Sequence, residues 1–112
     1  MRQDGKIDYV ELPGGDLPAV KDFYGRAFGW TFTDYGPDYA AFDEGVDGGF
    51  DGSADGVAKP LVVLFARDLE AMLATVEETG GEIVKPIFSF PGGPRFHFRD
   101  PAGNELAVWS ET

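Results

Sequence analysis

The sequence predicts an α+β fold built from two tandem β-α-β-β-β modules, and the main observation behind this is an internal repeat. The pair Asp16-Leu17 returns as Asp68-Leu69, and in each copy an apolar strand precedes it and a helical pattern follows. The chain of 112 residues is long enough for one domain with a core. We expect a single domain over 1–112, with the modules at about 5–52 and about 58–110, and a ligand site between them.

The first module begins with a strand at residues 7–12, which is followed by a helix. Asp16 is the expected N-cap, because its carboxylate can accept hydrogen bonds from the exposed amides of the first turn. Gly29 is expected to end the helix, since glycine readily adopts the left-handed conformation there. The apolar positions recur at helical spacing and should form the buried face: Leu17, Val20, Tyr24, Ala27 and Phe28.

Three short strands should complete this module. Residues 30–33 and 39–42 flank a turn at Gly36-Pro37 and have the composition of strands. Residues 48–56 are rich in glycine and aspartate. We expect them to hold a short edge strand and the link to the second module.

The second module repeats this order. Residues 61–65 form a strand, Asp68 caps the next helix, and Gly80-Gly81 ends it. The apolar face of that helix should consist of Leu69, Met72, Leu73 and Val76. The three last strands are expected at residues 82–90, 95–99 and 105–109. We expect the segment 91–94 to be a mobile flap between two of these strands, with Phe88 and Phe90 able to cover a ligand.

Composition excludes several classes of function. The chain has no cysteine, so disulfides, thiolate metal sites and thiol nucleophiles are ruled out. A net charge of -11 argues against nucleic acid as a partner, because polyanion binding needs a basic surface. No apolar run approaches the roughly 20 residues of a membrane span, and the start lacks a signal-peptide core. We therefore expect a cytoplasmic protein with no membrane partner.

The order of elements resembles that of the vicinal oxygen chelate superfamily, which includes glyoxalase I, fosfomycin and bleomycin resistance proteins, and extradiol dioxygenases. In the first half, Asp16-Leu17 leads into Phe23-Tyr24 and Phe28-Gly29-Trp30. In the second half, Gly80-Gly81 precedes residues 100–104, Asp-Pro-Ala-Gly-Asn, which are similar to the family's turn between its last two strands. The resemblance implies curved sheets around a cleft, and we expect a homodimer, because one small chain leaves sheet edges uncovered.

The segment Gly48-Gly49-Phe50 is similar to a segment of the small single-domain proteins in the glyoxalase-like subgroup. Metal-using members of the superfamily place one His, Gln or Glu at each of four strand positions. The resemblance assigns these positions to Tyr9, Leu61 or Val62, Ala107, and Gly49 or Phe50. Leu, Val and Ala have no donor atom, and Tyr seldom serves alone. We therefore expect no metal and no cofactor, and glyoxalase I activity does not follow from the fold.

Strand alternation predicts which side chains should face a ligand. The expected set is Tyr9, Glu11, Leu61, Val63, Arg95, His97, Glu105, Ala107 and Trp109. The alternate residues, among them Phe96, Phe98 and Val108, should pack against the helices. Apolar lining with a few polar groups is typical of a small-molecule pocket. Glu11 and Glu105 should favour a cationic or hydrogen-bond-donating ligand.

His97 is the single histidine and the best candidate for a general acid or base, because an ordinary imidazole pKa of about 6.5 allows proton transfer near neutrality. Its place before Asp100-Pro101 resembles that of a substrate-facing tyrosine in fosfomycin thiol transferases. We expect a metal-independent small-molecule binder that sequesters a drug or metabolite. The alternatives are a lyase or isomerase using His97 and Glu11, with or without a divalent metal held by Glu11, His97 and Glu105, and an interaction module without a ligand.

Overall fold

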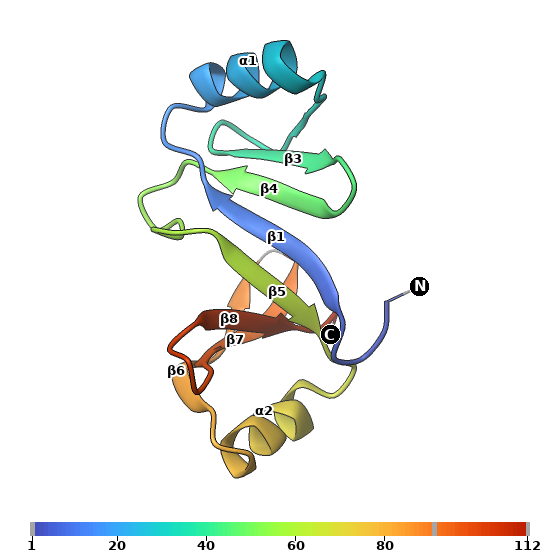
Figure 1. The fold of residues 1–112 in the computed structure, drawn as a ribbon, viewed down its shortest axis with the longest axis vertical. Coiled ribbons are helices and arrows are strands. Elements are labelled where there is room, and N and C mark those ends of the chain that lie inside the picture. Colours follow the sequence, from blue (N-terminus) through green and yellow to red (C-terminus); the bar gives the residue numbers. More distant parts are fainter. Residues whose placement is uncertain (1, 91, 112) are drawn as a thin grey trace. The chain divides into compact units, whose positions relative to one another are not determined.

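The computed structural model describes residues 2–90 and 92–111, apart from the side chain of Phe90. The described chain holds eight strands and two helices in the order β-α-β-β-β, repeated once (Figure 1). The predicted α+β class and element order are therefore confirmed. Neither of the helices described is long and apolar enough to cross a membrane. The chain divides into two compact units, one formed by Tyr9–Leu61 and the other by Met1–Asp8 with Val62–Thr112.

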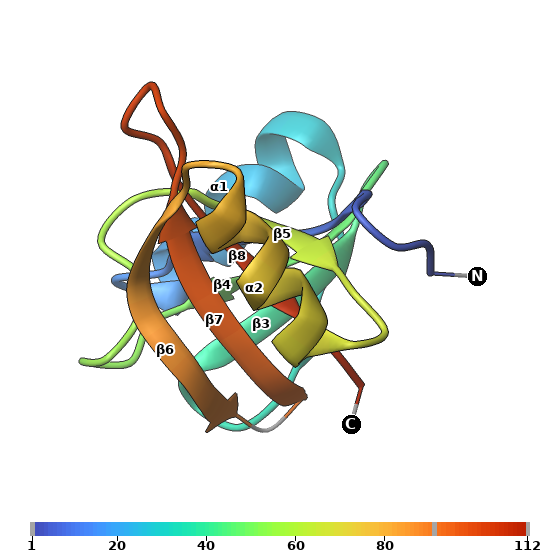
Figure 2. The ribbon, with the colours of Figure 1, turned by 90° about the horizontal axis from the view of Figure 1, so that it is seen from below.

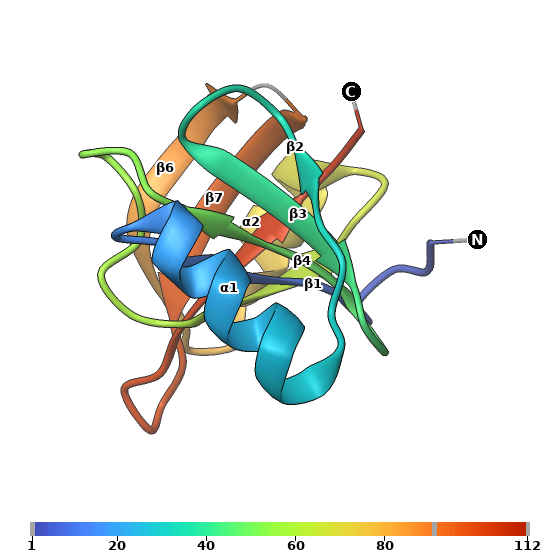
Figure 3. The same ribbon diagram turned by 90° about the horizontal axis from the view of Figure 1, so that it is seen from above.

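The Tyr9–Leu61 unit contains four strands and one helix. Its elements are β1 (Ile7–Pro13), α1 (Leu17–Phe28), β2 (Thr33–Asp34), β3 (Tyr39–Asp43) and β4 (Asp47–Asp51). The strand order is β2-β3-β4-β1, with β1 parallel to β4 and the other pairs antiparallel. Helix α1 crosses one face of these strands (Figure 3). Leu17, Ala40, Phe42 and Phe50 form the buried core on that face.

Two strand predictions for this unit were wrong in detail. The strand expected at residues 30–33 is β2, which covers only Thr33–Asp34, while Trp30 and Phe32 precede it and pack against the core. The expected edge strand is β4, and it is an inner strand paired with both β1 and β3. Gly48 explains this position, since an added Cβ would lie only 2.5 Å from the Val10 carbonyl oxygen.

The sequence also predicted more buried residues on α1 than the structure shows. Leu17, Val20 and Tyr24 reach the core, whereas Ala27 is exposed and Phe28 is 63% exposed. Trp30 follows the helix and stacks on Tyr24 with ring centroids 4.8 Å apart. The Trp30 ring thus fills the space that the helical pattern assigned to Phe28.

The second unit holds four strands and one helix. Its elements are β5 (Leu61–Phe65), α2 (Leu69–Glu78), β6 (Glu82–Phe90), β7 (Gly93–Arg99) and β8 (Glu105–Trp109). The strand order is β5-β8-β7-β6, and α2 covers one face (Figure 2). The core there is formed by Ala66, Leu69, Phe96 and Val108. Met72, Leu73 and Val76 pack against it, so the predicted apolar face of α2 is confirmed.

The prediction of a mobile flap at residues 91–94 was wrong for Gly93 and Pro94, and Pro91 lies outside the described residues. Gly93 and Pro94 are the first residues of β7. The Pro94 carbonyl accepts a hydrogen bond from the Ser110 amide at 3.0 Å, and an added Cβ at Gly93 would strike the Ser110 carbonyl oxygen. This close approach to the end of β8 holds the segment in the sheet.

The internal repeat has a direct structural meaning. Asp16 Oδ1 accepts a hydrogen bond from the Ala19 amide at 3.2 Å, and Asp68 Oδ1 accepts one from the Ala71 amide at 3.0 Å. Each aspartate thus satisfies one of the amides that the first turn of a helix leaves without an intrahelical partner. In both helices, the repeated Asp-Leu pair consists of an N-cap aspartate followed by a buried leucine.

We expect Asp16→Ala and Asp68→Ala each to lower the free energy of unfolding by about 1 kcal/mol, because each removes a helix N-cap. Urea denaturation followed by circular dichroism measures this. Asp22→Ala is the matched control, since Asp22 is exposed and forms an ion pair with Arg26 one turn along α1, and it should cost no more than about 0.5 kcal/mol. A cap variant as stable as this control contradicts the assignment.

Candidate functional site

Most predicted site residues lie on the face of the β5–β8 sheet opposite α2. Cross-strand register places Val63, Ala107, His97 and Lys85 in one row, and Phe65, Trp109, Arg95 and Phe88 in the next. The intervening residues Phe96 and Val108 belong to the core beneath α2, as alternation predicts. Val63 and Ala107 are buried on this face. The second unit therefore groups Val63, Arg95, His97, Glu105, Ala107 and Trp109 on one side of its sheet.

His97 is the buried polar centre of this face, with only 1% of the residue exposed. Its Nδ1 lies 2.8 Å from Glu105 Oε2. An ionised carboxylate can only accept, so in the neutral imidazole Nδ1 carries the proton and Nε2 is an acceptor. Among the described residues, Nε2 is buried without a hydrogen-bond partner. A buried polar atom left unpaired costs about 1–3 kcal/mol, and such a cost calls for an explanation.

Burial lowers the pKa of His97 below its usual 6.5, because the charged form loses solvation. The hydrogen bond to Glu105 opposes this pKa shift, while the charges of Arg95 and Lys85 add to it. The imidazole is therefore neutral near pH 7. Its Nε2 lone pair is then available to accept a hydrogen bond or a proton.

The Phe88 ring connects the charged neighbours of His97. Its centroid lies 5.6 Å from that of the His97 ring, 5.5 Å from Arg95 Cζ and 6.0 Å from Lys85 Nζ. Lys85 and Phe88 share this face although they are an odd number of residues apart, because the register of β6 shifts between them. Period-two alternation could not assign Lys85 to the site for that reason. The surroundings of Nε2 are thus aromatic and cationic.

Trp109 lies in the second row between Phe65 and Arg95, and residues from the beginning of the chain contact it. Its indole Nε1 donates a hydrogen bond to Asp8 Oδ2 at 2.9 Å, and Arg2 Cζ lies 5.0 Å from its ring. Phe65 contacts the ring edge-on, with centroids 5.7 Å apart. Sequence reasoning missed Arg2 and Asp8, since no local pattern links residues so far apart in the chain.

The three remaining predicted site residues, Tyr9, Glu11 and Leu61, belong to the other unit. Glu11 and Leu61 are buried there. The Tyr9 hydroxyl is hydrogen-bonded to the Tyr39 hydroxyl, and burial raises the pKa of both phenols, so both stay neutral. Tyr39 was missed as a site neighbour, although its place in a predicted strand offered the signal.

The residues at the family's metal positions do not fit a divalent metal. The Tyr9 hydroxyl is engaged by Tyr39, and the Tyr39 ring also covers Gly49, where an added Cβ would strike it. Leu61 and Ala107 supply no donor atom. The described residues include no cluster of three or more His, Cys, Asp or Glu side chains able to hold a metal ion. No metal-assisted step is therefore derived for this chain.

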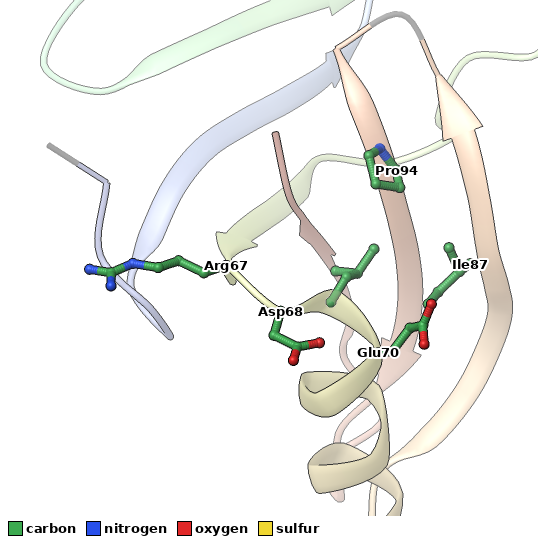
Figure 4. Close-up of a pocket in the computed structure, with 6 residues that line it drawn as sticks. Arg67, Asp68, Glu70, Ile87 and Pro94 are labelled. Carbon is green, nitrogen blue, oxygen red and sulfur yellow. The ribbon is translucent and has the colours of Figure 1, made fainter. Parts of the chain in front are cut away.

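An open recess of about 340 Å³ lies at the start of α2 (Figure 4). It is lined by Arg67, Asp68, Leu69, Glu70, Ile87 and Pro94, and none of the predicted site residues takes part. Asp68, its central carboxylate, already serves as the cap of α2. The recess offers a helix start and two acidic side chains, which do not make a binding site by themselves.

Comparison with solved structures supports the fold. Methylmalonyl-CoA epimerase from Mycobacterium tuberculosis has a TM-score of 0.72 at 12% identity, covering 100% of this chain and 91% of that one. A glyoxalase/bleomycin resistance protein/dioxygenase superfamily member from Vibrio splendidus 12B01 has a TM-score of 0.70 at 17% identity, covering 94% and 97%. The Mn(II)-bound glyoxalase from Novosphingobium aromaticivorans has a TM-score of 0.67 at 22% identity, but only 40% of that chain is covered against 99% of this one.

Similarity at these identities shows a shared fold, and the activities of those proteins do not transfer with it. No curated protein matches this sequence significantly. A family model supplies the stronger finding, since it matches residues 6–108 and so nearly the whole chain. This chain belongs to the Glyoxalase/Bleomycin resistance protein/Dioxygenase superfamily.

Proposed function

We propose that this chain binds a small organic molecule without the help of a metal ion, and that His97 Nε2 accepts a hydrogen bond from the ligand. The observation that carries the proposal is the buried Nε2 atom, which has no hydrogen-bond partner among the described residues while Nδ1 is fixed by Glu105. A ligand hydroxyl or amide would supply the missing donor. Binding would then remove the cost of the unpaired acceptor.

The neighbours of His97 support a compact, partly apolar ligand. Val63 and Ala107 offer apolar surface in the same row, and Phe88 offers a ring face in the next. Phe88 is half-buried on β6, the outer strand of its sheet. The register of β6 shifts between Lys85 and Phe88. Bulged outer strands are common beside binding sites because they can re-aim a side chain. Sequestration of a drug or metabolite is the role we assign to this binding.

A thermal-shift screen of a small-molecule library tests the proposal. Compounds that bind the folded protein raise its melting temperature by mass action, and we expect His97→Leu to abolish the shift for true ligands. Arg99→Gln is the matched control, since Arg99 is on the same strand and face but pairs with Glu82 at 2.8 Å. Hits that stabilise His97→Leu as much as the wild type would remove His97 from the site.

A second candidate is a lyase or isomerase in which His97 acts as a general base. The lowered pKa of His97 favours this role, because it keeps Nε2 deprotonated at neutral pH. Glu11, which is buried, is the second acid–base group of this candidate. Incubating the screened ligands in deuterated solvent distinguishes the two candidates. Loss of a ligand C–H signal that depends on His97 indicates an enzyme, and unchanged ligand spectra indicate a binder.

Metal independence gives a separate prediction. Elemental analysis of protein purified without chelators should find well under one equivalent of Zn, Ni, Fe or Mn per chain. Three of the four family positions have no side-chain donor atom, and the hydroxyl of the fourth, Tyr9, is hydrogen-bonded to Tyr39. The control is the same analysis of Glu11→Ala and His97→Ala, which should be unchanged. Near-stoichiometric metal that disappears in either variant contradicts metal independence.

A homodimer in the cytoplasm completes the proposal. The exposed aromatic rings of Phe23 and Phe28, 57% and 63% exposed, provide apolar surface on α1 for a second copy. Light scattering should give twice the chain mass of 12.1 kDa. Dimerisation should strengthen with added salt, because each chain carries a net charge of -11 that opposes association. A monomer at tens of micromolar in about 0.5 M salt contradicts this.

A further inference from the structure

We infer that the Trp109 indole forms part of a binding site for organic cations, and that the chain's own Arg2 occupies this site as an internal stand-in. The proposed site consists of Trp109 with Asp8 and Glu111, and it does not depend on the role of His97. Its ligand class is a compound that carries a guanidinium or a similar planar cationic group.

The contacts of Arg2 define the site. Its Cζ lies 5.0 Å from the Trp109 ring, which is within the range of a cation–π interaction. Its Nε donates to Asp8 Oδ2 at 3.2 Å, and its Nη1 lies 3.9 Å from Glu111 Oε2. The guanidinium is thus held by an aromatic face and two carboxylates.

The aromatic face is built into the fold. Asp8 Oδ2 also accepts the Trp109 indole N–H at 2.9 Å, so the same carboxylate orients the ring and binds the cation. Phe65 fixes the ring from its edge. The carboxylate is itself placed by pairing along β5, where the Phe65 carbonyl accepts from the Gly5 amide at 2.8 Å and the Phe65 amide donates to the Lys6 carbonyl at 3.2 Å.

The charge balance favours a replaceable cation. Asp8 and Glu111 contribute two negative charges beside the indole, and Arg2 supplies one positive charge. The Arg2 side chain is 41% exposed and Glu111 is 60% exposed, so their ion pair is weak in water. Removing Arg2 would leave two carboxylates and an oriented indole without their cation, while Asp8 and Trp109 keep their mutual hydrogen bond.

A guanidinium fits this site better than an ammonium ion. A planar guanidinium can stack on the indole and donate to a carboxylate at the same time, whereas a compact ammonium makes a single strongly hydrated contact. The site therefore selects ligands by a flat cationic group, and neutral analogues of the same shape should not bind.

The experiment compares Arg2→Ala with the wild type in titrations with arginine amide. The reporter is the indole Nε1–H signal of Trp109 in a ¹H–¹⁵N spectrum, assigned with Trp109→Phe. We expect a saturable shift in Arg2→Ala with an apparent affinity at least about threefold higher than in the wild type, where Arg2 competes. Arg67→Ala is the matched control, because it removes one exposed positive charge from the same unit at a different place and should behave like the wild type.

Two further measurements complete the test. Citrulline amide, a neutral analogue of nearly the same shape, should leave the Trp109 signal in place, and Asp8→Asn introduced into Arg2→Ala should abolish saturable binding. The dispersion of the remaining amide signals in the same spectrum reports whether each variant stays folded. Equal affinity of Arg2→Ala and Arg67→Ala, an equal shift with citrulline amide, or an unmoved Trp109 signal each overturns the proposal.

Discussion

Gly48→Ala is expected to destabilise the protein by about 3 kcal/mol, the upper part of the range for overpacking a close contact. A Cβ at this position would lie 2.5 Å from the Val10 carbonyl oxygen and would also strike the Phe42 ring. The Val10 carbonyl belongs to the backbone of the neighbouring strand, paired directly with Gly48. The clash can therefore be relieved only by moving β1 away from β4.

Gly25→Ala is the matched control for this prediction. Gly25 lies inside α1, where an added Cβ would approach nothing closer than the Trp30 carbonyl oxygen at 3.6 Å, an ordinary contact. Alanine in a helix interior stabilises relative to glycine by about 1 kcal/mol. Urea denaturation of both variants should thus show opposite signs. Equal stability of Gly48→Ala and the wild type would mean that β1 and β4 are not packed as described.

Local signals in the sequence were sufficient for the helix caps and for the core-facing residues of β7 and β8. Asp16 and Asp68 predicted both caps, because capping depends on residues three positions apart. Alternation predicted that Phe96 and Val108 pack beneath α2. These features depend on neighbours within a few residues, so a single sequence contains the information.

Features that depend on pairing between distant segments were not predictable in this way. Whether β4 is an edge or an inner strand is decided by its partners, and its glycines signalled a loop as readily as a close contact. The site shows the same limit. The hydrogen bond of His97 to Glu105 depends on the pairing of β7 with β8, and the contact of Trp109 with Asp8 joins the two ends of the chain.

The bulged strand β6 shows how one irregularity changes a predicted site. A strict two-residue period places Lys85 and Phe88 on opposite faces, yet the register shift brings both to the side of His97. The predicted lining combined the carboxylates of Glu11 and Glu105 with Arg95 and His97, and the carboxylates led to the prediction of a cationic ligand. The structure adds Lys85 beside Arg95 around the Phe88 ring, so the surroundings of His97 are more positive than the sequence indicated.

The titration of His97 is expected to occur below pH 6.5, and it can be followed without ambiguity because the chain has a single histidine. Burial is the main cause of the lowered pKa. Two variants should move the midpoint in opposite directions. Glu105→Gln should lower the pKa further, since the Glu105 contact raises it, and Lys85→Met should raise the pKa by removing a nearby positive charge. The imidazole C2–H signal in proton NMR spectra measures all three midpoints.

The same pKa shift predicts how stability depends on pH. Between the folded-state pKa and the unfolded value of about 6.5, the unfolded chain binds more protons at His97 than the folded protein does. The free energy of unfolding should therefore fall as the pH drops below about 6.5, with a contribution from this group of at most about 1.4 kcal/mol per pH unit. Urea denaturation at a series of pH values, compared with His97→Leu, isolates this contribution, because carboxylates titrate in both proteins. A midpoint at or above 6.5, or equal pH slopes in the two proteins, would show that His97 is solvated in the folded protein and would remove the basis for assigning its Nε2 to a ligand.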